Sequence, residues 1–153
     1  MISISVIGAG QVGTQFCKAI NATKNLHLEQ CYNRSKIGPE NGLDGVDFCN
    51  DLMQLKPADL YIIAVNDSAV EAISNALPFE KRLVVHTSGS VALRYLNKKN
   101  RKGVFYPLQT FSKTSNLDFV NVPICIETTD KSDRKLLKSV AETLGSPTYF
   151  IQS

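Results

Sequence analysis

Residues 3–13 of the chain read SISVIGAGQVG, and this stretch decides the fold. Its apolar first half is typical of a short buried strand, and it runs directly into Gly8, Gly10 and Gly13, spaced as G-x-G-x-x-G. Apolar residues then recur at helical spacing over residues 12–20, so the glycines connect a strand to an amphipathic helix. This context predicts a dinucleotide-binding turn, in which Gly10 lets a pyrophosphate approach the backbone and the helix N-terminus offers free N–H groups. The motif alone is also compatible with a glycine-rich turn that binds no ligand.

The residues that follow the second predicted strand indicate the cofactor. Residues 27–32 form that strand, and Asn33 comes twenty residues after Gly13, the spacing at which dinucleotide-binding domains meet the adenosine ribose. NAD-binding sites usually place Asp or Glu there, whereas Asn33 is neutral and is followed by Arg-Ser-Lys at residues 34–36. These groups attract a 2′-phosphate that a carboxylate would repel, so the stretch predicts NADP. The alternative is that the cations are only solvated loop charges.

Strands and helices alternate along the rest of the chain. Further strands are predicted at residues 46–48, 60–65, 83–86, 103–106, 124–127 and 148–151, and helices at 51–55, 68–77 and 130–144. This alternation predicts an α/β fold of the Rossmann type, a doubly wound, mainly parallel sheet in three layers. Ligands of such sheets bind at the carboxyl ends of the strands, here residues 8–13, 33–36, 66–68 and 86–90.

The helix predicted at residues 68–77 rests on two patterns. Ser68 and Glu71 match a capping box, which places the start of the helix at Ser68. Its core face is predicted to consist of Ala69, Ile73, Ala76 and Leu77.

Composition and charge exclude several classes of protein. The 153 residues suffice for one domain that buries roughly 70% of its unfolded surface. The formal charge of +3 is too small to imply a nucleic-acid partner. Residues 94–102 contain five basic residues, which we interpret as a helix end and an exposed turn rather than a nucleic-acid patch. The longest apolar run, residues 60–65, is far shorter than a membrane span.

The four cysteines carry no motif of their own. Cys17, Cys31, Cys49 and Cys125 are dispersed, without a C-x-x-C pair. We therefore expect reduced cysteines in a cytoplasmic protein, and no metal site.

Five motifs together resemble a known family: VIGAGQVG at residues 6–13, YNRS at 32–35, AVNDSAV at 64–70, VVHTSGS at 84–90 and GVFYPLQTF at 103–111. Over nearly its whole length the chain is similar to the dinucleotide-binding half of NADP oxidoreductases related to pyrroline-5-carboxylate reductase. Many dehydrogenases share the first motif, whereas the HTSGS and YPLQTF pair is more specific. The resemblance implies a Rossmann fold, NADP, hydride transfer, and a dimer formed through a helical C-terminal domain.

The resemblance also assigns residues by position. It implies pyrophosphate contacts from Gly8, Ala9, Gly10, Gln11, Val12 and Gly13, and adenosine contacts from Asn33, Arg34 and Ser35. It implies contacts near the ribose and the nicotinamide from Val65, Asn66, His86 and Thr87.

Candidate polar groups beside the nicotinamide are His86, Thr87, Ser88 and Gln109. His86 is a candidate general acid because imidazole titrates near neutral pH. The interpretation we favour is a strand-end histidine that fixes the following loop through a hydrogen bond. Asp67 and Glu71 are interpreted as helix-start residues rather than a catalytic pair of carboxylates.

The family pattern continues into a helical domain beyond the strand predicted at residues 148–151, where this sequence stops. We expect residues 1–153 to form the dinucleotide-binding domain, to bind NADPH without measurable turnover, and to form the family's homodimer only with the helical domain. In the oxidoreductase, hydride would pass between NADP(H) and a small imine or carbonyl substrate, with no nucleic-acid or membrane partner.

Two alternative functions stay open at this point. One is a nucleotide-binding or redox-sensing module without turnover. The other is a methyltransferase-like α/β domain, which is disfavoured because no acidic residue follows the second strand to bind a ribose diol.

Overall fold

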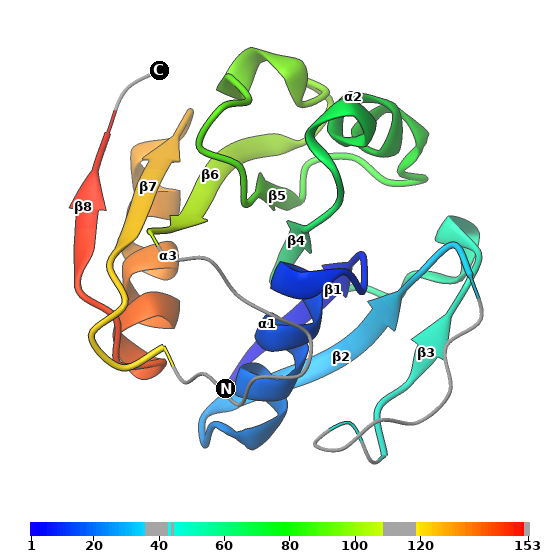
Figure 1. Ribbon diagram of the computed structural model, residues 1–153. Helices are drawn as coiled ribbons and strands as arrows, with labels where there is room; N and C mark the ends of the chain where they lie inside the picture. The colour runs from blue at the N-terminus through cyan, green and yellow to red at the C-terminus, as the bar shows by residue number, and fades with distance from the viewer. Residues whose placement is uncertain (36–42, 44, 109–118, 152–153) are drawn as a thin grey trace.

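The computed structural model describes residues 1–35, 43, 45–108 and 119–151, which fold into one sheet with helices on both faces (Figure 1). In the described part of the chain the sheet has eight strands in the order β3-β2-β1-β4-β5-β6-β7-β8. The strands are β1 (Ile2–Ile7), β2 (Leu26–Tyr32), β3 (Phe48–Cys49), β4 (Leu60–Ile63), β5 (Leu83–His86), β6 (Arg101–Pro107), β7 (Ile124–Thr128) and β8 (Thr148–Phe150). The helices are α1 (Gln11–Ala22), α2 (Asp67–Ala76) and α3 (Lys131–Thr143), with 3-10 turns at Leu52–Gln54 and Leu93–Tyr95.

Two apolar clusters fill the space between the layers. Phe16 of α1 and Leu137 of α3 pack with Ile62 of β4 on one face of the sheet. Val70 of α2 packs with Ile63, the next residue of β4, on the other face. Side chains alternate across a strand, so β4 must be apolar at consecutive positions to serve both clusters. The predicted three-layer Rossmann-type fold is confirmed.

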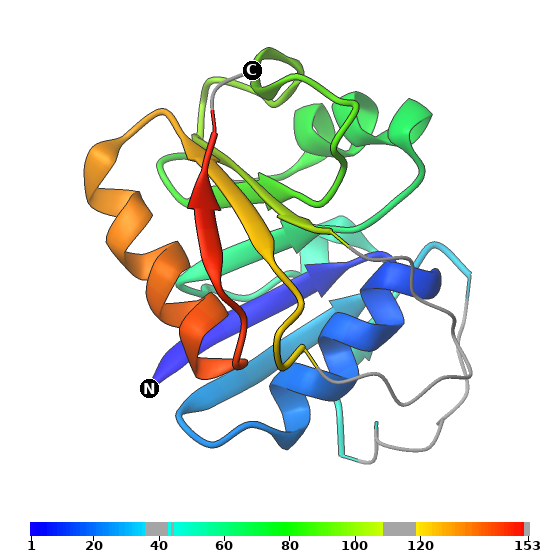
Figure 2. The ribbon, with the colours of Figure 1, turned by 60° about the vertical axis from the view of Figure 1, so that its left-hand side comes forward.

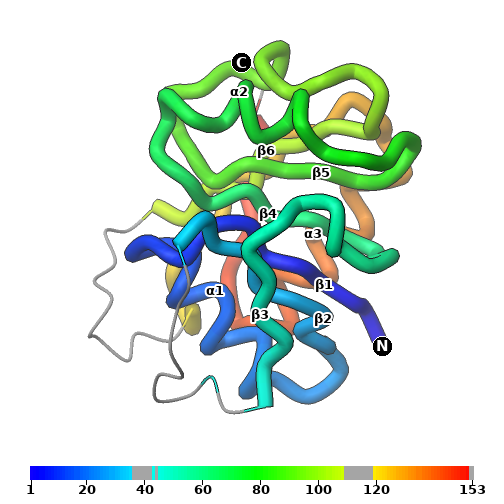
Figure 3. Tube along the Cα trace, turned by 90° about the vertical axis from the view of Figure 1, so that its right-hand side faces the viewer, coloured from blue at the N-terminus to red at the C-terminus, as the bar shows by residue number. Residues whose placement is uncertain are grey.

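The order of the strands creates a crevice beside β1. The chain builds β1, β2 and β3 outward in one direction, then crosses back to place β4 on the other side of β1 (Figure 3). The loops that follow β1 and β4 therefore diverge at the carboxyl ends of these strands, and a doubly wound sheet binds its ligands at such a switch point. At the far edge, β7 runs antiparallel to β6, and β8 lies beside β7 as the edge strand (Figure 2).

The prediction for the helix after β4 is wrong in two respects. The helix begins at Asp67 with Asn66 as N-cap, so Ser68 is not its cap. Its buried side chains are Val70 and Ser74, one position later than the predicted Ala69 and Ile73, whereas the predicted Leu77 is buried at the C-cap. Ser74 tolerates burial because its Oγ accepts a hydrogen bond of 2.7 Å from the backbone N–H of Asn97.

The basic stretch at residues 94–102 is only partly a helix end and turn. Lys99 does donate to the backbone carbonyls of Asn75 and Leu77 at the C-terminal end of α2, where a cation is favourable. Arg101, however, belongs to β6, and its Nε lies 3.0 Å from the buried carboxylate of Asp133 on α3. The sequence could not show this, because Asp133 lies 32 residues further along the chain.

The expectation that all four cysteines are reduced is wrong for one pair. The structure joins Cys17 of α1 to Cys31 of β2 as a disulfide, whereas Cys49 and Cys125 are free. Both members of the pair belong to the cluster beneath α1, so the packing of α1 on β2 brings them together. Their separation of 14 residues matches no short cysteine motif.

Candidate functional site

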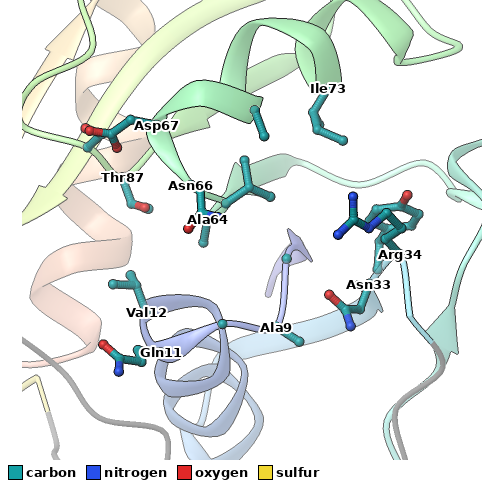
Figure 4. Close-up of a pocket in the computed structure, with 16 residues that line it drawn as sticks. Ala9, Gln11, Val12, Asn33, Arg34, Ala64, Asn66, Asp67, Ile73 and Thr87 are labelled. Atoms are coloured by element: carbon teal, nitrogen blue, oxygen red, sulfur yellow. The ribbon is translucent and has the colours of Figure 1, made fainter.

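A pocket of about 570 Å³ opens at the carboxyl ends of the central parallel strands (Figure 4). Its walls are residues 8–12 after β1, 32–34 at the end of β2, 64–67 after β4 and 87–88 after β5, together with Ala69 and Ile73 of α2. The volume falls within the range of roughly 300–1,000 Å³ that small-molecule sites occupy. The four loops predicted to meet at one edge of the sheet therefore do meet there.

Gly8 and Gly13 are required by packing. Gly8 has a φ of +115°, and a Cβ there would lie 2.3 Å from the carbonyl oxygen of Ala64. A Cβ on Gly13 would lie 2.1 Å from the carbonyl oxygen of Gly8. No side chain fits at either position, so these two glycines press α1 against β1 and β4.

Gly10 is different because the fold itself does not demand a glycine there. Its backbone is extended, with a φ of −73°, and a Cβ would meet nothing within 4 Å. That open space is the floor of the pocket. A ligand that approaches the backbone closely is therefore the physical reason for a residue without a side chain at position 10.

The N-terminus of α1 forms one side of the same floor. Gly10 is the N-cap, no side chain caps the helix, and its first turn contains no acidic residue. The side chains of Gln11 and Val12, in that first turn, line the pocket (Figure 4). Uncapped N–H groups and the positive end of the helix dipole suit a phosphate at this place.

Arg34 is the only cation among the described residues that line the pocket. It follows β2 and lies with Asn33 at one end of the pocket (Figure 4). The side-chain amide of Asn33 donates a 3.0 Å hydrogen bond to the carbonyl oxygen of Ser35, which shapes the turn that presents Arg34. A neutral turn with one guanidinium group can accept a phosphate without electrostatic repulsion.

The opposite end of the pocket is built from the loops after β4 and β5. Asp67 and Thr87 lie there (Figure 4), next to Ser88. The hydroxyl of Ser90 donates a hydrogen bond of 2.6 Å to Oδ2 of Asp67, which ties the two loops together. The hydrogen bond from Ser90 is the main reason why the pKa of Asp67 lies below its ordinary value, and the hydrogen bond from Ser88 is the second.

His86 lies beneath this loop and does not line the pocket. It is fully buried, and its Nδ1 accepts a hydrogen bond of 3.0 Å from the backbone N–H of Ser88. Burial lowers the pKa of His86, against the opposing effects of the Val91 carbonyl and the carboxylates of Asp67 and Glu127. This geometry agrees with a histidine that fixes the loop, and it gives no access for the predicted cofactor contact or for proton donation to a ligand.

The structure brings most of the predicted site residues together. The pocket is lined by Gly8, Ala9, Gly10, Gln11, Val12, Asn33, Arg34, Val65, Asn66 and Thr87. Gly13 and His86 lie behind its walls, and Ser35 contributes its carbonyl to the turn rather than a lining surface. Gln109 lies outside the described residues.

Five lining residues were not among the predicted site residues, namely Tyr32, Ala64, Asp67, Ala69 and Ile73, and for the last three the reason is identifiable. Ala69 and Ile73 have the spacing of a core face, and that spacing is the same for a helix side that faces a ligand. Asp67 was attributed to the start of the helix, which is correct, but its position also places it in the pocket. The short Ser-Gly-Ser segment after β5 was the available signal for the hydroxyl groups around it.

The fold and the pocket together define a Rossmann-type nucleotide-binding domain. No family model matches the sequence, and a search of curated proteins finds no match. Among solved structures, the chain is similar to a proposed NADP oxidoreductase from Bacteroides fragilis, with a TM-score of 0.86 and 33% identity over 99% of this chain.

Two further structures share the fold at lower identity. One is the pyrroline carboxylate reductase of Plasmodium falciparum with NADP bound, with a TM-score of 0.77 and 15% identity over 99% of this chain. The other is the prephenate dehydrogenase of A. aeolicus with NAD+, with a TM-score of 0.75 and 15% identity over 99% of this chain. The resemblance stated from the sequence motifs is confirmed. The chain spans about three-fifths of these proteins, namely 61%, 58% and 60% of their lengths.

None of the helices in the described residues has the length and apolarity needed to cross a membrane. Within the same residues, no three His, Cys, Asp or Glu side chains gather in a way that could hold a metal ion.

Proposed function

We propose that this chain is the NADP(H)-binding domain of an oxidoreductase. The observation that carries the proposal is the pairing of an open floor at Gly10 with a cationic turn at Arg34. The first accommodates a pyrophosphate against the N-terminus of α1, and the second accommodates a 2′-phosphate at the end of β2.

The comparisons support this proposal in different ways. The Bacteroides fragilis protein is similar at 33% identity across almost the whole chain, and its name includes NADP. The more distant structures share the fold alone, and they hold NADP in one case and NAD+ in the other. Because the fold accepts either cofactor, the choice of NADP rests on Asn33 and Arg34 of this chain.

We further propose that the oxidoreductase transfers hydride between NADP(H) and a small imine or carbonyl substrate. The sequence motifs at residues 84–90 and 103–111 support this proposal through the family they resemble. When bound, the nicotinamide supplies or accepts the hydride. The part of this chain is to hold the cofactor: Val12, Asn66 and Thr87 surround the end of the pocket opposite Arg34. A binding or redox-sensing module without turnover is the second candidate function.

A binding screen tests the proposal. The purified chain is titrated separately with NADPH, NADH, FAD and S-adenosylmethionine, and binding is followed by calorimetry. We expect NADPH to bind most tightly. Preferential binding of S-adenosylmethionine or FAD would contradict the proposal, and so would the absence of binding by any dinucleotide.

A further inference from the structure

The pocket carries opposite charges at its two ends (Figure 4). Among the described lining residues, Arg34 is the only cation and Asp67 the only carboxylate. Arg34 follows β2, whereas Asp67 is the first residue of α2, on the other side of β1. A ligand that fills the pocket from end to end therefore meets a positive charge at one end and a negative charge at the other.

Asp67 is held in place as an anion. Ser90 donates to its carboxylate at 2.6 Å, and the hydrogen bonds from Ser90 and Ser88 lower the pKa of Asp67. Its position in the first turn of α2 also favours the ionised form, because the positive end of the helix dipole lies there. His86 is the nearby titratable group, and burial lowers its pKa, so it is neutral at neutral pH.

The charge of Asp67 is not neutralised by a neighbouring cation. Within the described part of the chain, the ion pairs are His27–Glu29, Lys56–Asp47 and Arg101–Asp133, and none involves Asp67. The side-chain partners of Asp67 are serine hydroxyls, which fix the carboxylate but leave its net charge intact. This negative charge is therefore available to a ligand in the pocket.

The loop that holds Asp67 is itself anchored to the sheet. Ser88 donates its backbone N–H to Nδ1 of the buried His86 at 3.0 Å. Ser90 donates its backbone N–H to the hydroxyl of Ser88 at 3.1 Å and its own hydroxyl to Asp67. This chain of hydrogen bonds runs from the end of β5 to the carboxylate, so Asp67 is preorganised at the end of the pocket.

The placement of the nicotinamide ring rests on the proposed function. With the 2′-phosphate at Arg34 and the pyrophosphate at Gly10, the nicotinamide ring lies toward the end of the pocket that contains Asp67. This ring carries a positive charge when oxidised and none when reduced. We propose that Asp67 makes the pocket selective for the oxidation state of the cofactor, raising its affinity for NADP+ relative to NADPH.

The size of the effect follows from exposure. Asp67 is exposed at its end of the pocket, so water screens its interaction with the ring. A charge pair a few ångströms apart in such surroundings changes an equilibrium by about three- to tenfold. The effect should also diminish with ionic strength, because the screening length is about 10 Å at 0.1 M salt.

The test measures dissociation constants rather than activity. NADP+, NADPH and 2′,5′-ADP, which contains only the adenosine end, are titrated into the wild type and Asp67→Asn. In Asp67→Asn we expect the affinity for NADP+ to fall about three- to tenfold relative to NADPH, with 2′,5′-ADP unchanged. Asp67→Glu keeps the charge and should keep most of the wild-type ratio.

Glu71→Gln is the matched control. Glu71 is exposed on α2, one turn beyond Asp67, and it does not line the pocket. Its removal subtracts the same charge from the same helix and should leave the NADP+ to NADPH ratio unchanged. Equal effects of Asp67→Asn and Glu71→Gln, or an unchanged ratio in Asp67→Asn, would overturn the proposal.

A measurement on the wild type keeps the proposal testable even if Asp67→Asn does not fold. Raising the salt concentration should lower the wild-type affinity for NADP+ relative to that for NADPH, because both forms share the same phosphates and differ in the ring charge. A ratio that does not change with salt would contradict the proposal. If the wild type binds neither form, the proposed function fails and this inference with it.

Discussion

A Cβ added to Gly13 would lie 2.1 Å from the carbonyl oxygen of Gly8, so the first and last glycines of the motif are packed against one another. Gly10, between them in the sequence, faces open space. One short motif therefore combines two positions that serve the fold with one that serves a ligand. The two roles predict different consequences of mutation.

The fold role predicts that Gly13→Ala destabilises the protein. Alanine improves helix propensity by about 1 kcal/mol. The contact with the Gly8 carbonyl forces a backbone shift, and overpacking of this kind costs about 1–3 kcal/mol or more. The clash is the larger effect, so we expect a lower free energy of unfolding in urea. A more stable variant would show that α1 does not pack as closely on Gly8 as the structure indicates.

The ligand role predicts that Gly10→Val greatly weakens cofactor binding but reduces stability only slightly. Valine replaces an acceptable N-cap with a poor one, which costs about 1 kcal/mol of stability. NADPH affinity should fall at least about 100-fold, because the side chain displaces a pyrophosphate whose hydrogen bonds each contribute about 1.5–3 kcal/mol. Calorimetric titration of the folded variant measures this loss. If Gly10→Val bound NADPH as tightly as the wild type does, the pyrophosphate would have to bind somewhere other than at Gly10.

Arg34 should determine the choice between cofactors. In Arg34→Asp we expect NADPH affinity to fall by at least about tenfold, because a charge-assisted contact is replaced by repulsion. NADH affinity should rise or hold, since a carboxylate at this place can accept a hydrogen bond from the ribose hydroxyl. Lys138→Asp makes the same charge change at an exposed site on α3 outside the pocket and should alter neither affinity.

His86 should make the folded state sensitive to mild acid. Burial lowers its pKa from an ordinary value of 6.5, so the unfolded chain takes up a proton that the folded protein does not. Stability from this group is complete above pH 6.5 and is lost as the pH falls from there toward the folded pKa, with a slope of up to about 1.4 kcal/mol per pH unit. Urea unfolding of the wild type and His86→Gln across this range measures the difference. Identical slopes would contradict the buried neutral state.

The local signals of the site were readable in the sequence. Gly8, Gly10 and Gly13 were recognisable from their spacing between a strand and a helix, and Asn33 and Arg34 from their spacing after β2. The contact that requires Gly8, with the carbonyl of Ala64, was not itself visible in the sequence. The interpretation of His86 as a loop-fixing residue was also available, because a strand-end histidine can reach its own loop two residues later.

The features that were not predicted depend on contacts between distant segments. The side of α2 that faces the pocket was taken for a core face, because Ala69 and Ile73 look alike in sequence whether a ligand or a sheet covers them. The pairing of Cys17 with Cys31 and the ion pair of Arg101 with Asp133 require the packed structure. Such contacts are set by tertiary packing, which local periodicity does not encode.

The affinities of the wild-type chain for NADPH and NADH test the central claim most directly. Both are measured by calorimetric titration under the same buffer conditions, with no substrate present. The account predicts saturable binding of NADPH at least about tenfold tighter than that of NADH, the equivalent of one charge-assisted contact between Arg34 and the 2′-phosphate. Equal affinities, or tighter binding of NADH, would contradict it.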